Sequence, residues 1–350
     1  MKTQYSADYV GPVQVLVVGA GLAGLAAARD LARAGLRVHL LDKSRGVSGR
    51  AATRWLELDG KTLRIDHGAQ YFTAKGDGLR IILPDLVEQG IVREWAQGFP
   101  VLSENGIETR TSRHPRYICP EGMSALGKAF LKGIEDKDLH LPLETKALVT
   151  QLYRSESDGH WQALLENGEI RSGHTLLLNL PAPQALKLSE EFLKPEVKMA
   201  LEAVRFAPCW TLVLVLESLP YLDWVGLEIK HPVLAWAALD HTKRMVEGPP
   251  VLVLQATPQW SQEHLEQTPE EVLPLLLAAA RELLGDWVTR YRLALAHRWR
   301  YAKPIQIHPW PFLAQDNLVF CGDWCGGARI ESALESGWAA ADYLLRHLSD

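Results

Sequence analysis

The stretch VQVLVVGAGLAGLAAARDLARAGLRVHLLD, residues 13–42, decides the fold of this chain. Val13–Val18 is dominated by β-branched residues and leucine, which is typical of a strand buried on both faces. A helix is predicted over Leu22–Ala34, with Gly35 just past its end, and a second buried strand over Leu36–Leu41. The pattern predicts a parallel βαβ unit of about thirty residues.

A glycine pattern joins the first strand to the helix. It reads Gly19-Ala20-Gly21-Leu22-Ala23-Gly24, and Asp42 ends the second strand. In such a GxGxxG pattern the first glycine permits the tight turn, the second lets a pyrophosphate approach the backbone, and the third lets the helix pack closely. The helix N-terminus attracts phosphates, and the aspartate accepts hydrogen bonds from a ribose diol. The sequence therefore predicts a dinucleotide site.

Two further elements favour FAD over NAD. The segment Lys43–Arg50 contains a second glycine turn, Ser48-Gly49, and Arg50 can reach the pyrophosphate. A plain NAD dehydrogenase has no use for this second phosphate clamp. Far along the chain, a strand over Leu318–Cys321 leads into Gly322-Asp323 and a helix predicted over Ile330–Leu348. The N-terminus of that helix is expected to face the flavin and to stabilise its reduced, negatively charged state.

Composition limits the class of protein. The 350 residues, 47% apolar and 23% charged, predict about two globular domains. A balance of 37 basic and 42 acidic residues, or −5, argues against a main role in nucleic-acid binding. The four cysteines have no metal-ligand spacing, so we expect no metal site and reduced thiols in a cytoplasm. Residues 13–28 are too short for a membrane span, and neither a span nor a signal peptide is expected.

The remaining periodicities place further elements along the chain. Residues 1–12 are read as a polar arm. Helices are predicted over 122–134, 195–204 and 269–284, and strands over 147–153, 161–165, 170–180, 212–216 and 251–255. Because no linker separates two halves, we expect interleaved domains. The FAD-binding domain is assigned residues 1–75, 115–182 and 310–350, and the substrate domain residues 76–114 and 183–309.

Several stretches together resemble the renalase family of FAD-dependent oxidoreductases, in the glutathione-reductase-like superfamily near the flavin amine oxidases. They are DKSRGVSGRAATR at 42–54, DHGAQYFTAK at 66–75, ICPEGMSAL at 118–126, VLQATPQWSQEHLE at 253–266, HRWRYAKP at 297–304 and CGDWCGGARIESALESG at 321–337. The chain departs from the family at Ser48, where a glycine is more frequent. A small residue should still fit there, with less backbone freedom.

The resemblance implies an α/β fold, with a Rossmann-type FAD-binding domain interleaved with a smaller mixed sheet-and-helix substrate domain. It also implies the residues that contact FAD. They are Gly19, Ala20, Gly21, Leu22, Ala23, Gly24, Asp42, Lys43, Ser48, Gly49, Arg50, Gly68, Ala69, Gln70, Tyr71, Val149, Asn179, Gly322, Asp323, Arg329 and Ile330.

The activity that the resemblance implies is oxidation of the 2- and 6-dihydro isomers of NAD(P)H. Hydride passes to flavin N5, NAD(P)+ leaves, and dioxygen is converted to hydrogen peroxide. This reaction needs no general base, and no catalytic side chain is assigned. Expected partners are a small dinucleotide substrate and O2, without nucleic acid or membrane, and the oligomeric state is left open. The substrate-pocket candidates are Tyr71, Phe72, Trp236, His241, Trp299 and Trp324.

Other interpretations remain open from the sequence. The chain has twelve tryptophans, and simple core packing explains each candidate tryptophan equally well, while His241 fits a surface position. An amine oxidase acting on a small amine would share the fold and cofactor, and would need an aromatic cage and a lysine near the flavin, for which Lys303 is a candidate. A FAD-binding interaction protein without turnover is the third interpretation.

Overall fold

The computed structural model describes residues 13–109, 112, 114–132 and 141–348, so the predicted arm at 1–12 lies outside the described residues. The chain forms two compact units and passes between them four times. Unit 1 comprises Met1–Gly49, Leu126–Arg205 and Pro304–Asp350, and unit 2 comprises Arg50–Ala125 and Phe206–Lys303. These boundaries differ from the predicted ones, because residues 50–75 and 115–125 belong to unit 2, and residues 183–205 and 304–309 to unit 1.

Unit 1 is built on an eight-stranded sheet. Its strands are β1 (Val13–Val18), β2 (Val38–Asp42), β9 (Leu143–Thr145), β10 (Val149–Arg154), β11 (Trp161–Leu165), β12 (Ile170–Leu178), β18 (Leu313–Gln315) and β19 (Leu318–Phe320). The central strands β19, β12, β1, β2 and β9 run parallel to one another. At the edges, β10, β11 and β12 form an antiparallel ribbon, and β18 is antiparallel to β19. The predicted βαβ unit is confirmed by β1, β2 and the helix between them.

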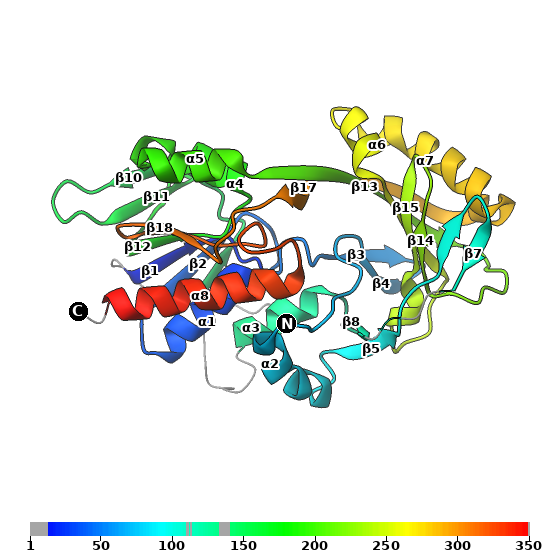
Figure 1. Ribbon diagram of the computed structural model, residues 1–350, viewed down its shortest axis with the longest axis horizontal. Helices are drawn as coiled ribbons and strands as arrows, with labels where there is room; N and C mark the ends of the chain where they lie inside the picture. The colour runs from blue at the N-terminus through cyan, green and yellow to red at the C-terminus, as the bar shows by residue number, and fades with distance from the viewer. Residues whose placement is uncertain (1–12, 110–111, 113, 133–140, 349–350) are drawn as a thin grey trace. The chain divides into compact units, whose positions relative to one another are not determined.

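The helices of unit 1 follow the predicted order. They are α1 (Leu22–Arg33), α3 (Ser124–Lys132), α4 (Ala182–Ser189), η1 (Glu190–Phe192), α5 (Pro195–Ala203) and α8 (Ile330–Leu348). Helices α1 and α8 run side by side along the sheet (Figure 1). Glycine makes this contact possible, because a Cβ on Gly337 would lie 2.2 Å from the backbone oxygen of Ala23.

Unit 2 is built on a seven-stranded sheet in the order β17-β13-β16-β15-β14-β6-β7. Its strands are β6 (Val101–Ser103), β7 (Gly106–Glu108), β13 (Arg205–Leu216), β14 (Gly226–Ile229), β15 (Leu234–Leu239), β16 (Val251–Ala256) and β17 (Tyr291–Gln306). Two hairpins accompany the sheet: β3 (Thr53–Leu58) with β4 (Lys61–Asp66), and β5 (Arg93–Ala96) with β8 (Arg116–Ile118). The helices are α2 (Asp77–Glu88), η2 (Asp240–Lys243), α6 (Pro258–Glu263), α7 (Pro269–Leu284) and η3 (Asp286–Thr289).

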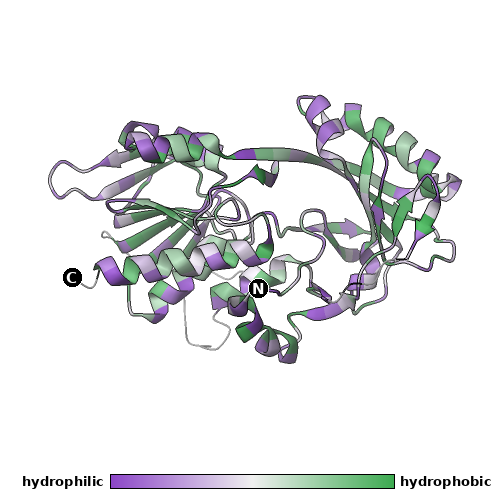
Figure 2. Ribbon diagram, viewed as in Figure 1, coloured by the Kyte–Doolittle hydropathy of each residue, from purple (hydrophilic) through white to green (hydrophobic). Residues whose placement is uncertain are grey.

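Both faces of this second sheet are buried, which explains its continuous apolar strands. Leu212, Leu214 and Leu216 of β13 pack with α7, while the alternating Val213 and Val215 pack with Ile65 of the β3–β4 hairpin. The strands are correspondingly hydrophobic in Figure 2, whereas α7 alternates between hydrophobic and hydrophilic residues. The hairpin therefore belongs to unit 2, although its sequence follows the dinucleotide-binding segment directly.

None of the described helices is both long and apolar enough to cross a membrane.

The contact between α1 and α8 gives a stability prediction. Alanine usually stabilises a helix relative to glycine by about 1 kcal/mol. At Gly337 we expect the opposite sign, a loss of about 1–3 kcal/mol in the free energy of unfolding, because the added methyl group overpacks against the Ala23 backbone. Denaturant unfolding of Gly337→Ala measures the effect. Gly248→Ala is the control, because no heavy atom lies within 4 Å of its added Cβ. Equal stability of the two variants would contradict the prediction.

Candidate flavin and substrate sites

The dinucleotide loop is held in a conformation that only glycine supports. Gly19 has φ +103°, and a Cβ there would lie 2.3 Å from the backbone oxygen of Asn179. A Cβ on Gly24 would lie 2.3 Å from the backbone oxygen of Gly19, so the third glycine permits close packing of α1. Gly21 is the N-cap of α1 and carries no side-chain cap. The first N–H groups of the helix therefore suit an anion such as a pyrophosphate.

Asp42 fixes the loop through both carboxylate oxygens. Ala20 N–H donates to Oδ2 and Ser44 N–H donates to Oδ1, each over 2.7 Å. A carboxylate has about four lone-pair positions, so each oxygen can accept one further hydrogen bond. The predicted role toward a ribose diol is therefore chemically possible, and the structure adds a second role, which is to hold the loop.

Asn179 links three segments that are distant in the sequence. It follows β12, and its N–H donates to Val18 O over 2.8 Å. Its side-chain amide donates to Gly19 O over 3.1 Å, and its Oδ1 lies 3.8 Å from the position a Cβ would take on Gly322. Because β12 pairs with both β1 and β19, the residues that follow these strands meet at one edge of the sheet. The structure thus brings together the start of the Gly19–Gly24 turn, Asn179 and Gly322.

Ser48 shows how this chain accommodates its departure from the renalase pattern. Its φ is +86°, a region that favours glycine, and it is 2% exposed. Its N–H donates to Ala20 O over 2.8 Å, which ties the second glycine turn to the first. A small residue does fit, as expected, at the cost of a strained backbone.

The other predicted residues of unit 1 lie at its edges. Val149 is buried and opens β10, while Arg329 is exposed and precedes α8. Trp324 is fully buried, and its Nε1–H donates to Leu180 O over 3.0 Å. Its surroundings match the packing interpretation that the sequence left open. Trp324 belongs to unit 1, whereas the other aromatic candidates belong to unit 2.

In unit 2, the segment after β4 is held tightly by its neighbours. Ala69 N–H donates to Arg50 O over 2.9 Å, and a Cβ on Gly68 would lie 2.0 Å from that same oxygen. Gln255 donates from Nε2 to Gly68 O over 2.8 Å. The Arg50 guanidinium lies 5.5 Å from the centre of the Phe206 ring and donates to Ala302 O. Four residues of the predicted flavin segment, Gly68 to Tyr71, are therefore preorganised by contacts within the unit.

Gln70 uses its whole side chain inside the protein. Its Nε2 donates to Asp66 O over 2.6 Å and to Gly68 O over 3.1 Å, and its Oε1 accepts from Lys243 Nζ over 3.0 Å. The residue is 5% exposed. The side chain thus holds the backbone of its own segment, and a flavin contact at this position would involve the main chain.

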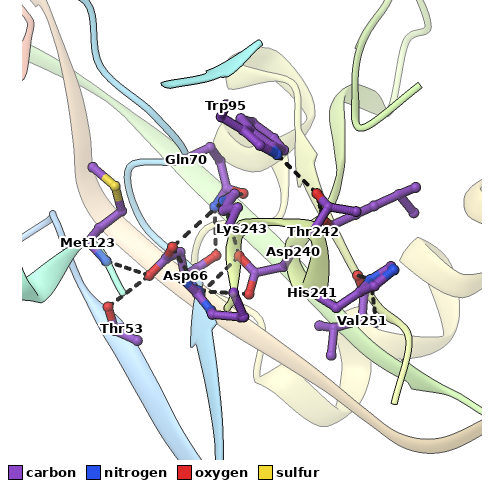
Figure 3. Close-up of polar contacts among 12 residues, drawn as sticks. Thr53, Asp66, Gln70, Trp95, Met123, Asp240, His241, Thr242, Lys243 and Val251 are labelled. Carbon is purple, nitrogen blue, oxygen red and sulfur yellow. Dashed lines mark hydrogen bonds and ion pairs between the residues drawn. The ribbon is translucent and has the colours of Figure 1, made fainter. Parts of the chain in front are cut away.

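A buried cluster of four charges contacts this segment, and Figure 3 labels three of them, Asp66, Asp240 and Lys243. Arg244 contacts Asp66 and Asp240 over 2.8 and 2.9 Å, and Lys243 lies 3.0 Å from Asp240 and 3.8 Å from Asp66. Thr53 Oγ1 and Met123 N–H both donate to Asp66 Oδ1 over 2.8 Å. Burial raises the pKa of Asp240, and the two cations act against this shift. Two carboxylates and two cations balance, as buried charges require.

Aromatic rings gather beside Tyr71. The centre of its ring lies 5.0 Å from that of Phe99 and 5.5 Å from that of Trp236, and Phe99 also lies 5.2 Å from Trp95. Trp236 is 8% exposed, and its Nε1–H has no hydrogen-bond partner among the described residues. The structure therefore brings together two of the predicted pocket residues, Tyr71 and Trp236.

A guanidinium group lies over this aromatic cluster. Arg116 is 5.6 Å from the centre of the Tyr71 ring and 5.9 Å from that of Phe99. It donates to Ser112 Oγ and His114 O, which hold its orientation. Burial raises the pKa of Tyr71, while Arg116 acts in the opposite direction. The cluster therefore combines flat apolar surface with a positive charge.

A second group joins His67, His297 and Trp299. The two imidazole centres are 4.7 Å apart, Trp299 lies 5.2 Å from His67, and its Nε1–H donates to His67 O. Burial lowers the pKa of His67 to about 4, with His297 and Arg54 adding to the shift. Burial and Arg54 also lower the pKa of His297 to about 4. Both rings are therefore neutral at physiological pH.

The remaining pocket candidates lie elsewhere in unit 2. Phe72 is buried and pairs with Tyr117, and His241 is half-buried with its Nδ1 3.3 Å from Val251 O. Lys303 is exposed. Sequence reasoning missed Lys243, Arg116, Trp95, Phe99 and Gln255. The one local signal was the basic pair Lys243-Arg244, shortly after Asp240. Nothing in the sequence shows that this pair meets Asp66.

No group of three or more His, Cys, Asp or Glu residues in the described part of the chain could hold a metal ion.

Comparison with known proteins identifies the family. Residues 17–82 match the profile described as NAD(P)-binding Rossmann-like domain, and residues 97–345, more than half of the chain, match that of Flavin containing amine oxidoreductase. The chain belongs to the flavin-containing amine oxidoreductase family. It is therefore an oxidoreductase with FAD as its cofactor, and the predicted fold class is confirmed.

Individual relatives are distant. Tryptophan 2-monooxygenase of Pseudomonas savastanoi is 28% identical over 184 residues, and carotenoid phi-ring synthase of Streptomyces griseus is 34% identical over 130 residues. These matches cover 52% and 35% of this chain but only 27% and 24% of the relatives, so the chain matches about a quarter of their length.

Solved structures share the fold over nearly the whole chain. Cyclohexylamine oxidase from Brevibacterium oxydans IH-35A has a TM-score of 0.73 at 10% identity, covering 97% of this chain and 100% of that one. Putrescine oxidase bound to putrescine has a TM-score of 0.70 at 14% identity, covering 96% and 99%. At such identities the similarity establishes the fold alone.

The loop geometry predicts the effect of Asp42→Ala. We expect loss of the two carboxylate oxygens that accept from the backbone N–H groups of Ala20 and Ser44 to destabilise the protein by about 1–3 kcal/mol and to weaken FAD retention. Thermal unfolding at increasing FAD concentration measures both effects, because a ligand of the folded state raises Tm. Asp342→Ala is the control, since its ion pair with Arg346 is exposed. An FAD dependence of Tm identical to that of the unsubstituted protein would refute the role of Asp42.

The neutral histidines predict a specific acid sensitivity. Their folded-state pKa values of about 4 lie below the ordinary 6.5, so the unfolded chain binds more protons between these pH values. Their contribution to stability is complete above pH 6.5 and is lost as the pH falls toward 4. The free energy of unfolding should therefore decrease less steeply between pH 6.5 and 4 in His297→Gln than in the unsubstituted protein. Parallel curves would contradict this account.

Proposed function

We propose that this chain is a renalase-like oxidase, which takes hydride from the 2- and 6-dihydro isomers of NAD(P)H and releases NAD(P)+ and, with O2, hydrogen peroxide. Family membership supports the class of chemistry. The stretches at 42–54, 66–75 and 321–337 support the narrower assignment through their resemblance to renalases. The observation that carries the substrate class is the position of Arg116 over the Tyr71 and Phe99 rings.

We propose that FAD binds to the residues that the resemblance implies. The turn at Gly19–Gly24 and the uncapped N-terminus of α1 fit a pyrophosphate, and Asp42 retains acceptor capacity for a ribose. In unit 2, Arg50 and the Gly68–Tyr71 segment are proposed to contact the cofactor. When bound, FAD supplies a hydride acceptor that dioxygen can regenerate.

The charge of the aromatic cluster discriminates between substrate classes. A dinucleotide carries negative phosphates, which a guanidinium binds through charge-assisted hydrogen bonds, and its flat nicotinamide ring can stack on aromatic side chains. The free Nε1–H of Trp236 offers a further donor. A protonated amine would be repelled by Arg116, although the exposed carboxylate of Glu228 also acts on Tyr71.

The chain's residues need only bind and orient this substrate. Removing hydride from a dihydronicotinamide produces an aromatic cation without proton transfer, so no general base is required. The lysines fit this picture, because Lys303 is exposed and Lys243 is committed to Asp240 and Gln70. His67 and His297 are neutral and place no charge beside the substrate's developing positive charge.

An amine oxidase remains the second candidate, since the rings of Tyr71, Phe99 and Trp236 could enclose a small apolar amine. One experiment separates these two candidate functions. The purified holoprotein is mixed anaerobically with 6-dihydro-NAD and, separately, with a panel of amines, and flavin absorbance is followed. We expect bleaching by the dihydro isomer. Bleaching by amines alone would overturn the proposal.

Arg116→Met tests the substrate-binding role. Loss of a hydrogen bond to a charged group costs about 1.5–3 kcal/mol, so kcat/KM for the dihydro isomer should fall about 10- to 100-fold, mainly through KM. The exposed Arg80 of α2 supplies the control variant Arg80→Met. If Arg116→Met left KM unchanged or improved turnover of an amine without affecting the dihydro isomer, Arg116 would not recognise the proposed substrate.

A further inference from the structure

Charge balance explains why the buried cluster around Lys243 holds a second cation, but it does not explain where the ammonium group of that cation lies. Arg244 contacts both Asp66 and Asp240, and it also donates to the backbone oxygens of Arg64 and Cys119. Lys243 adds a second cation that is fully buried. Its ammonium group reaches Gln70, which Arg244 does not contact among the interactions described. The position of Lys243 therefore requires its own explanation.

We propose that Lys243 is a positioning residue, which joins the Gly68–Tyr71 segment to the aromatic cluster through Gln70 and Trp95. This inference rests on the proposed function, because that function places the segment against FAD and the cluster against the substrate.

The first link runs through the amide of Gln70. Lys243 donates to Oε1, so the amide is oriented with Nε2 toward Asp66 O and Gly68 O. An amide turned the other way would direct its NH2 group at the ammonium and its oxygen at two carbonyl oxygens. The lysine thus selects the single amide orientation that clamps the backbone on both sides of His67.

The second link runs through Trp95 (Figure 3). Lys243 Nζ lies 5.0 Å from the centre of the Trp95 ring, and Trp95 Nε1–H donates to Thr242 Oγ1 over 2.9 Å. Trp95 in turn contacts Phe99, whose ring packs on Tyr71 and Trp236. A cation over a ring face is attracted to it, most strongly where water is excluded. One ammonium group therefore contacts both Gln70, which holds the Gly68–Tyr71 segment, and Trp95, which packs on the aromatic cluster.

Asp240 holds Lys243 in place. Its Oδ1 lies 3.0 Å from Nζ and its Oδ2 2.9 Å from Arg244, so the carboxylate fixes both cations. Both acidic groups and Lys243 are fully buried, so water does not substitute for a missing partner. Replacement of Lys243 should consequently displace Gln70 and Trp95, because solvent does not screen the charges that remain.

The experiment compares Lys243→Met with Arg244→Met. Both remove one cation from the same carboxylates, but only the first removes contacts to Gln70 and Trp95. Hydrogen exchange of the backbone amides in residues 66–75 is measured by mass spectrometry on the holoprotein. We expect faster exchange of the Gly68–Tyr71 amides in Lys243→Met and Gln70→Met than in Arg244→Met. Lys243→Gln, which retains a donor toward Gln70, should restore part of the protection.

Anaerobic reduction of the flavin by 6-dihydro-NAD gives the functional readout. The limiting reduction rate should fall about 10- to 100-fold in Lys243→Met, with little further loss when Gln70→Met is added, because both changes break the same link. If Lys243→Met does not fold, Asp240→Asn combined with Lys243→Met keeps the charge of the cluster balanced and replaces it in both measurements. Exchange and reduction rates equal to those of Arg244→Met would overturn the proposal.

The two proposals fail in different ways. If the unsubstituted holoprotein is not reduced by any dihydro isomer, the proposed function is wrong, whereas exchange still reports on the link from Lys243 to Gln70. If the unsubstituted protein is reduced but the Lys243 variants keep its rate and protection, the proposed function stands and Lys243 is only a structural charge.

Discussion

The architecture depends on backbone approaching backbone where glycine leaves no Cβ. At Gly24 this approach lets α1 pack against the carbonyl of Gly19, and at Gly337 it lets α8 pack against α1. Both contacts would be lost with the smallest side chain, because an added methyl group would lie 2.2–2.3 Å from a backbone oxygen. The dinucleotide loop keeps its shape only while α1 stays this close to the end of β1. Asp42 and Asn179, which both follow the loop in the sequence, then fix it through hydrogen bonds with Ala20 N–H and Gly19 O.

Unit 2 meets a different constraint. Its sheet is buried on both faces, one by α7 and one by the β3–β4 hairpin. The hairpin ends at Asp66, and the segment that follows cannot move freely because Asp66 and Gln70 belong to the buried polar network. A fully satisfied buried network specifies one arrangement of its members, since each alternative leaves a charge or an amide unpaired. The segment proposed to contact FAD is consequently held in one arrangement by its own unit.

The positive charge beside the aromatic cluster discriminates between the candidate substrates better than the fold does. Cyclohexylamine oxidase and putrescine oxidase share the fold at 10% and 14% identity, so fold alone leaves the substrate open. The cluster around Tyr71 has the aromatic surface that an amine pocket would need, yet Arg116 gives it a positive charge. The substrate assignment therefore depends on one guanidinium and its orientation by Ser112 and His114.

The sequence by itself determined the βαβ unit, the positions of most strands and helices in unit 1, the glycine-rich turn and the relation to FAD-dependent amine oxidases, whereas the narrower renalase assignment stays a proposal. These features are local, because glycine spacing and hydrophobic periodicity act over a few residues. Only the tertiary structure decided that the β3–β4 hairpin belongs to unit 2, that Gln70 is committed to internal hydrogen bonds, and that Lys243 and Arg116 meet Gln70 and Tyr71. Lys243 and Gln70 are separated by 173 residues, and Arg116 and Tyr71 by α2, β5 and the β6–β7 hairpin, so no local pattern records these contacts. Their contacts arise from sheet pairing and from the need to neutralise buried charge, which act between segments and leave little trace in any one of them.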